Sequence, residues 1–182
     1  TLFEISVFMV TISSFGALAQ WPIGYISDKI DRRIILIAIT FIAAGLSIFI
    51  VISSYLSFIL FIILSGIFSA MSLPMFSVAV AHVNDFLESN EIISASSTFN
   101  ILIGVGSILG PILVSSSMTL VGPNGFFIYL FLVHGTLGLF GLYRMARRVK
   151  PRDLESQYIP LPRNISAAGM EMNPIVESNE ED

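Results

Sequence analysis

The amino-acid sequence predicts an all-α protein that crosses a membrane five times. Hydrophobic residues make up 54% of its 182 residues and charged residues only 12%, with a mean hydropathy of +0.85. No charged residue occurs from Ile5 to Ser27 or from Ile34 to Ala81. A helix needs about 20 apolar residues to cross a bilayer, and lipid offers no hydrogen-bond partner to an open strand. We therefore expect these stretches to be membrane-spanning helices.

The candidate spans follow one another through residues 1–150, and each is long enough to cross a bilayer. They cover about residues 5–26, 34–52, 58–81, 92–118 and 125–143. The connections between them are short, so neighbouring helices are expected to run antiparallel.

Prolines and glycines inside the spans indicate kinks and close helix packing. Kinks are expected at Pro22, Pro74 and Pro111. Close approach of helix backbones is expected at Gly106 and Gly110 in the fourth span and at Gly135, Gly138 and Gly141 in the fifth.

The basic residues predict which side of the membrane each end of a span faces. All nine Lys and Arg residues lie between the first two spans or after the fifth. Positive charge gathers on the cytoplasmic side, so these segments are expected in the cytoplasm and Thr1 outside. Residues 151–182 are rich in Pro, Ser, Asn and Glu, a composition that predicts a mostly disordered cytoplasmic tail.

The connection between the first two spans carries five charges within six residues and contains the sequence Gly-x-x-Ser-Asp-Lys-x-Asp-Arg-Arg. This sequence resembles the loop signature of the major facilitator superfamily, which joins the second and third helices of each six-helix half. The resemblance implies a gating loop whose charges lock the cytoplasmic side in the outward-open state. Its candidate residues here are Gly24, Asp28, Lys29, Arg32 and Arg33. The alternative is a loop whose basic residues only fix orientation.

Two acids of this loop are unusual. Asp28 lies at the carboxyl end of a helix, where the helix dipole disfavours an acid. We therefore expect it to be held by a partner: Arg32, Arg33 or the amino terminus of another helix. Asp31 stands where the signature usually has glycine.

The third span ends in a polar group that has two interpretations. His82, Asn84 and Asp85 fit ordinary capping residues at the membrane interface. The segment 74–85 is also similar to one subfamily of bacterial permeases labelled as sugar or drug carriers. Residues 20–24 and 158–163 resemble that subfamily too.

Polar residues inside spans are costly in lipid and are candidates for a solute site. If the spans are helices eight to twelve of a superfamily carrier, the resemblance places the first, third and fourth beside the central cavity. The candidates there are Ser13, Gln20, Ser69, Ser72 and Asn100. Hydrogen bonds between helices, without a ligand, are an equally good explanation. For His134 in the fifth span we expect a structural role, because the twelfth helix of the superfamily is peripheral.

The function expected from this pattern is solute transport. The chain has no cysteine, and no nucleophilic or metal-ligand set is evident, so we expect no enzyme, cofactor, metal site or nucleic-acid partner. The resemblance implies the C-terminal part of a carrier in a bacterial-type inner (plasma) membrane, working by alternating access. Its partners would be the missing N-terminal half, a small-molecule substrate and the lipid bilayer. The alternative is a non-transporting membrane scaffold or subunit.

Overall fold

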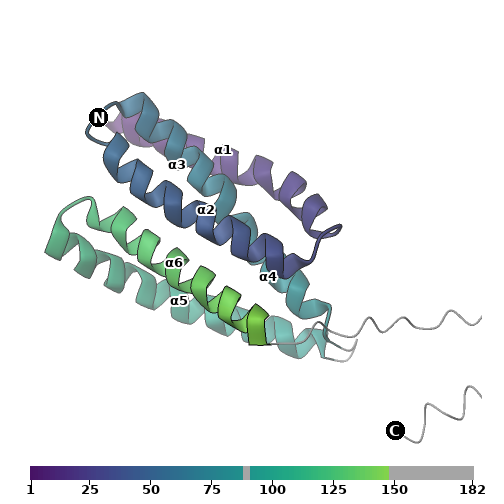
Figure 1. Cartoon of the computed structure of the whole chain (residues 1–182). Helices are drawn as coiled ribbons and strands as arrows, with labels where there is room; N and C mark the ends of the chain where they lie inside the picture. Colours follow the sequence, from purple (N-terminus) through teal and green to yellow (C-terminus); the bar gives the residue numbers. More distant parts are fainter. Residues whose placement is uncertain (88–90, 148–182) are drawn as a thin grey trace, which may run out of the picture. The chain divides into compact units, whose positions relative to one another are not determined.

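A computed structural model describes residues 1–87 and 91–147 (Figure 1). This part is all-α, as the sequence predicts, with no strand among the described residues. Its helices are α1 (Leu2–Ser27), α2 (Arg32–Ser53), α3 (Phe58–Ser72), α4 (Pro74–Asn84), α5 (Ile92–Val121) and α6 (Gly125–Arg147). The predicted disorder of the tail, residues 151–182, lies outside the described residues.

By length and composition, the described part contains five helical segments able to cross a membrane, one for each predicted span. The third, Phe58–Asn84, consists of α3 and α4, which are separated at Leu73. Pro74 explains the interruption, because proline has no amide N–H to donate to the preceding turn. Pro22 and Pro111 lie inside helices that continue through them.

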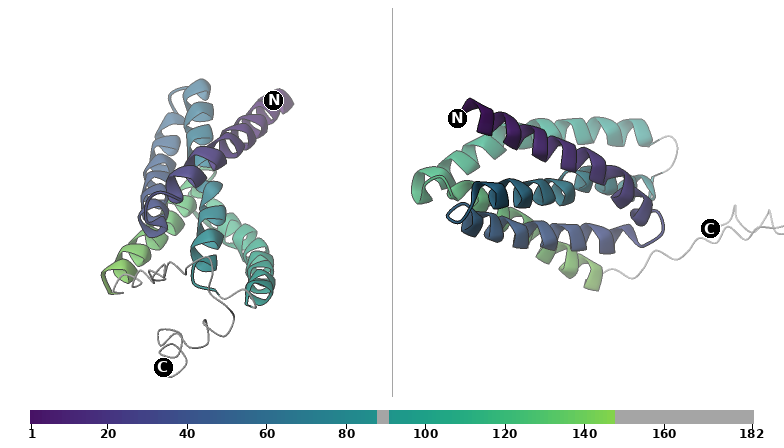
Figure 2. Two further views of the ribbon diagram at one scale, coloured as in Figure 1. Left: turned by 90° about the vertical axis from the view of Figure 1, so that its right-hand side faces the viewer. Right: turned by 90° about the horizontal axis from the view of Figure 1, so that it is seen from above.

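The helix α2 lies at the centre of the described part, between α3 and α6 (Figure 1). On one side, α1 packs on α3 and α4; on the other, α5 packs on α6. The helices lie lengthwise beside one another in the right view of Figure 2 and spread apart at an angle in the left view. The loops after α2 and α5 meet at one end, where Asn124 hydrogen-bonds to Tyr55 and to Ser54. The short connections therefore produce the up-and-down arrangement expected from the sequence.

The apolar side chains divide into a small interior and a large exposed surface. Ile23, Ile39 and Val78 form a buried cluster between α1, α2 and α4. The helix α5, in contrast, buries no residue. Most of its large apolar side chains, such as Leu102 and Ile108, are exposed. This distribution suits helices in lipid, which is as apolar as the side chains themselves.

Close packing occurs at some of the predicted glycines and not at others. A Cβ on Gly138 would lie 3.0 Å from the Phe41 ring, and one on Gly141 would lie 2.9 Å from Ile37 Cγ1. The prediction is therefore confirmed for these two, which face α2. For Gly106, Gly110 and Gly135 it is wrong within the described residues, because nothing lies within 4 Å of the position of a Cβ.

Two glycines that the sequence pattern did not single out bring α1 and α3 together. A Cβ on Gly16 would lie 2.7 Å from Ser69 Oγ and even closer to Leu73. One on Gly66 would lie 3.0 Å from Thr11 Cγ2. These distances are shorter than nearly all real Cβ contacts, so the pair α1–α3 depends on both glycines.

Candidate functional site

The charged loop between α1 and α2 is stabilised by local caps. Ser27 Oγ donates to the carbonyl of Gly24 (2.8 Å), and the amide of Asp28 donates to the same carbonyl (3.1 Å). Asp31 then caps α2, its side chain accepting from the amide of Arg33 (2.9 Å). Asp31 has a φ of −48°, so this position needs no glycine here. Aspartate instead supplies an acceptor for the free amides at the start of the helix.

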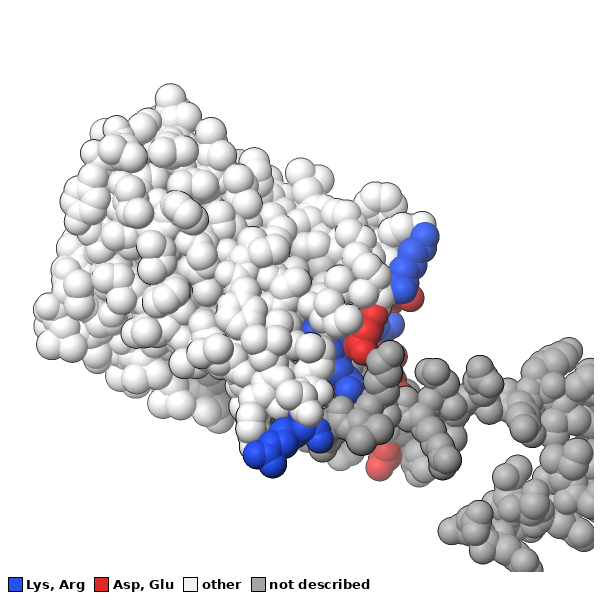
Figure 3. All heavy atoms as spheres, viewed as in Figure 1, with Lys and Arg blue, Asp and Glu red and all other residues white. Residues whose placement is uncertain are grey.

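Arg32 connects this loop to the end of the third span. Its Nη2 lies 2.8 Å from Asp28 Oδ1, and its Nη1 lies 3.1 Å from Asp85 Oδ1. One guanidinium therefore joins the ends of α1 and α4 to the start of α2. Arg32 is one of the three partners expected for Asp28. On the face drawn in Figure 3, the Lys, Arg, Asp and Glu side chains gather at this end of the helical part.

The exposure of these groups limits what the ion pairs contribute to stability. The Arg32 side chain is 21% exposed, but those of Asp28 and Asp85 are 65% and 49% exposed. Exposed pairs typically stabilise a protein by about 0.2–1 kcal/mol each. The cluster is therefore better suited to selecting one arrangement of three helix ends than to holding the protein folded.

The other two basic residues of the loop contact aromatic rings instead of acids. Lys29 lies over the ring of Tyr25, with Nζ 4.2 Å from the centroid. Arg33 lies over the ring of Phe86, at 5.7 Å. Gly24 has open space where a Cβ would be. Of the five predicted loop residues, the structure thus brings only Asp28 and Arg32 into the charge cluster.

The end of the third span contributes Asp85, which is also the C-cap of α4. The ring of His82 packs edge-on against that of Phe86, with centroids 5.2 Å apart. Asn84 is exposed. Sequence reasoning named Asp85 as a cap or a subfamily feature but missed its pairing with Arg32, which lies 53 residues away. The available signal was that both residues fall on the same predicted side of the membrane.

The polar residues inside the spans separate into two groups. Ser69 is buried and donates to the carbonyl of Ile12 on α1 (2.6 Å). Ser72 lies 3.2 Å from Nε2 of His134 on α6. His134 is itself buried, and its Nδ1 lies 2.8 Å from the carbonyl of Leu130. In this structure these side chains link helices, the structural role expected for His134.

Ser13, Gln20 and Asn100 are instead exposed. The first two lie on α1 and the third on α5, and no extended contact joins these helices. The described residues therefore do not enclose these three candidates in one cavity. Within residues 1–87 and 91–147, no group of His, Asp and Glu is arranged to hold a metal ion.

The family model described as Major Facilitator Superfamily matches residues 1–168. The chain belongs to this superfamily. Similar proteins include the Uncharacterized MFS-type transporter YcaD of Escherichia coli O139:H28 (strain E24377A / ETEC), of O9:H4 (strain HS) and of strain K12 / DH10B. Each is 28% identical over 127 residues, which cover 70% of this chain and 32% of the relative. No solved structure matches the chain significantly.

The superfamily assignment and the five apolar helical segments identify an integral membrane protein of a transporter family. They point away from an enzyme. The aligned part spans about a third of the curated relatives. The cluster of Asp28, Arg32 and Asp85 is the strongest candidate site in the described part.

Proposed function

We propose that the chain forms the C-terminal part of a carrier that moves a small solute by alternating access, with its spans as helices eight to twelve. The observation that carries the proposal is the Arg32 cluster, which joins the ends of three helices through exposed ion pairs. Such contacts can form in one arrangement of the carrier and open in another. In secondary transporters, rocking of one helix set against another exposes a central site alternately to each side.

The exposed polar residues of α1 and α5 favour the presence of a second set of helices that packs against them. Ser13, Gln20 and Asn100 would contact lipid in the described part alone, which is unfavourable. Gly106 and Gly110 also leave room on α5 for another helix. We propose that an N-terminal half of the same carrier covers these surfaces. The solute site would then lie between the halves, with these side chains on one wall.

The membrane orientation can be tested with single cysteines, since the chain contains none. We propose a bacterial inner membrane with the Arg32 cluster on the cytoplasmic side. A membrane-impermeant maleimide should label Ser54→Cys and Asn124→Cys in intact cells. Asn90→Cys and Ser156→Cys should react only after the membrane is opened. Labelling of Asn90→Cys from outside would contradict the orientation.

Reconstitution tests the proposed function itself. The 182-residue chain alone in liposomes should give no saturable uptake of candidate sugars or drugs, because it supplies one wall of the proposed cavity. Co-expression with an N-terminal half should give uptake that saturates with solute concentration. Empty liposomes and an Arg32→Gln complex are the controls.

The outcomes separate the alternatives. Saturable uptake by the chain alone would contradict the need for two halves and indicate a small self-associating transporter. The two halves could also form a stable complex that neither transports nor measurably binds any candidate solute. That result would favour a non-transporting scaffold.

A further inference from the structure

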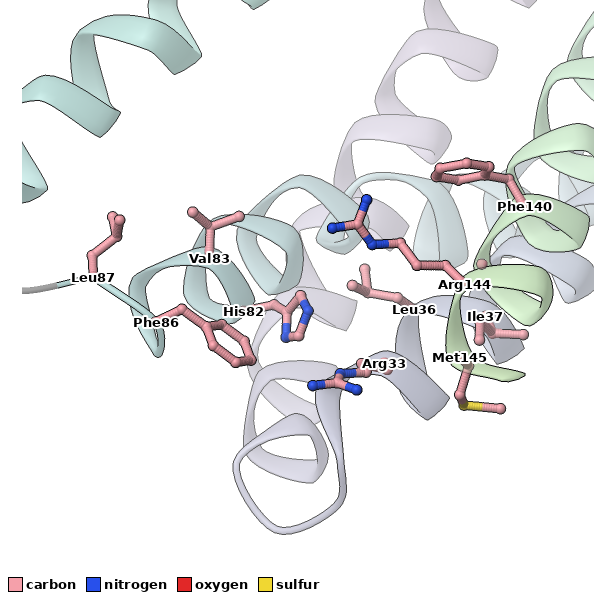
Figure 4. A pocket seen from close by; sticks show the side chains of 11 residues that line it. Arg33, Leu36, Ile37, His82, Val83, Phe86, Leu87, Phe140, Arg144 and Met145 are labelled. Atoms are coloured by element: carbon pink, nitrogen blue, oxygen red, sulfur yellow. The ribbon is translucent and has the colours of Figure 1, made fainter. Parts of the chain in front are cut away.

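A cavity of about 500 Å³ lies between α2, α4 and α6, next to the Arg32 cluster. The three helices contribute Arg33, His82 and Arg144 respectively, and Figure 4 shows these side chains extending toward the same space. The volume falls within the range of about 300–1,000 Å³ that is usual for small-ligand sites. Sequence analysis did not identify this cavity, because its residues come from three separate spans.

The ionisable side chains that line this cavity are two arginines and one histidine, with no carboxylate among the lining residues. Arg32 beside it is paired with two acids, whereas Arg33 and Arg144 form no ion pair with a described residue. Two described acids of the adjoining loops are already engaged, since Asp85 contacts Arg32 and Asp31 caps α2. Among the described residues, no acid is paired with the two arginines of the cavity, and their positive charge favours an anionic ligand.

The rest of the wall is apolar. Leu36, Ile37, Val83, Phe86 and Phe140 surround the cationic groups. A ligand that fits this cavity has an anionic head to contact the cationic groups and a hydrocarbon body to contact the apolar wall. A small soluble anion would leave this apolar wall without a partner.

The level at which the cavity lies in the membrane fits such a ligand. Arg33 is the second residue of α2, His82 lies two residues before the end of α4, and Arg144 lies three residues before the end of α6. All three positions are at the ends of spans, where the phosphate groups of a bilayer lie. Basic pockets between membrane helices at this level bind anionic lipid head groups.

We propose that this cavity binds an anionic phospholipid of the adjacent leaflet. Arg33 and Arg144 hold the phosphate from two sides through charge-assisted hydrogen bonds, as guanidinium groups commonly do. An acyl chain lies along the apolar wall between α4 and α6. Because Arg33 follows Arg32 directly and Phe86 follows Asp85, a bound lipid adjoins the proposed gating cluster without being part of it.

Native mass spectrometry of the 182-residue chain in a neutral detergent tests the proposal. Phosphatidylglycerol and phosphatidylcholine with the same acyl chains are titrated separately. Both lipids carry the phosphate, but the choline cation of phosphatidylcholine cancels its negative charge and is repelled by the two arginines. Phosphatidylglycerol should therefore bind about tenfold more tightly. In Arg33→Gln/Arg144→Gln the two lipids should bind within about twofold of each other.

A matched variant controls for total charge. Lys29→Gln/Arg147→Gln also removes two positive charges at the same end of the bundle, but neither residue lines the cavity. It should keep the wild-type preference. Equal loss of preference in both double variants, or a preference that persists without Arg33 and Arg144, would overturn the proposal.

Two further measurements do not depend on the fold of a variant. Phosphatidylglycerol with a photoreactive acyl chain should label wild-type peptides that contain Val83 or Phe140, and labelling confined to other helices would overturn the site. Glycerol phosphate at millimolar concentration should not displace the lipid, and full displacement would assign the site to a soluble phosphate instead. These results do not depend on uptake, so they can fail while the proposed transport function stands.

Discussion

Replacing Arg32 with glutamine is expected to slow transport by the complete carrier about fivefold while leaving its amount in the membrane unchanged. One guanidinium holds both Asp28 and Asp85, so its loss releases two helix ends from the start of α2. Coupling between two states of a protein typically amounts to about 1–3 kcal/mol, or roughly 5- to 150-fold. The lower end applies here because both carboxylates are well exposed.

The measurement is the initial uptake rate in vesicles, normalised to the carrier present. Asp28→Asn should slow transport less than Arg32→Gln, because the contact between Arg32 and Asp85 remains. Arg147→Gln is a matched control: its guanidinium lies over the Tyr143 ring, 5.3 Å from the centroid, and has no described acid partner. The gating role would be contradicted if Arg32→Gln takes up solute normally but cysteine labelling shows a changed membrane orientation. The loop would then only fix the orientation of the helices.

The substitution Gly16→Leu is expected to destabilise the helical bundle. Gly16 is buried against α3, and Ser69, which a Cβ would meet at 2.7 Å, is held by its hydrogen bond to Ile12. The larger side chain must therefore separate α1 from α3. Overpacking typically costs about 1–3 kcal/mol, and this position also offers little room for repacking.

Thermal unfolding in detergent and the monodisperse fraction in size-exclusion chromatography measure this effect. The midpoint should fall by about 2–12 °C. Gly45→Leu is the matched control, since it makes the same substitution in a membrane helix where nothing lies within 4 Å of a Cβ. Equal midpoints for the two variants would contradict the close approach of α1 and α3.

The arrangement of spans could be predicted from the sequence because it depends on local properties. Long uncharged stretches such as 34–52 leave the backbone in lipid no alternative to a helix. Short polar segments between them force the chain to turn. The loop signature at residues 24–33 pointed to the superfamily for the same reason, since its residues are adjacent in the sequence. Arg32, one of the three partners expected for Asp28, lies four residues away and pairs with it.

The tertiary structure decided which faces of the helices meet, and this depends on how each helix is rotated. Asp85 and Arg32 pair across 53 residues, and Arg33 and Arg144 meet at one cavity, although no local pattern connects them. Glycine spacing is also ambiguous, because it permits close helix packing without specifying which helix is the partner. Gly138 meets α2 whereas Gly110 meets nothing in the described part. In helices apolar on every side, hydrophobic pattern cannot choose the buried face, so packing shape and a few polar contacts make that choice.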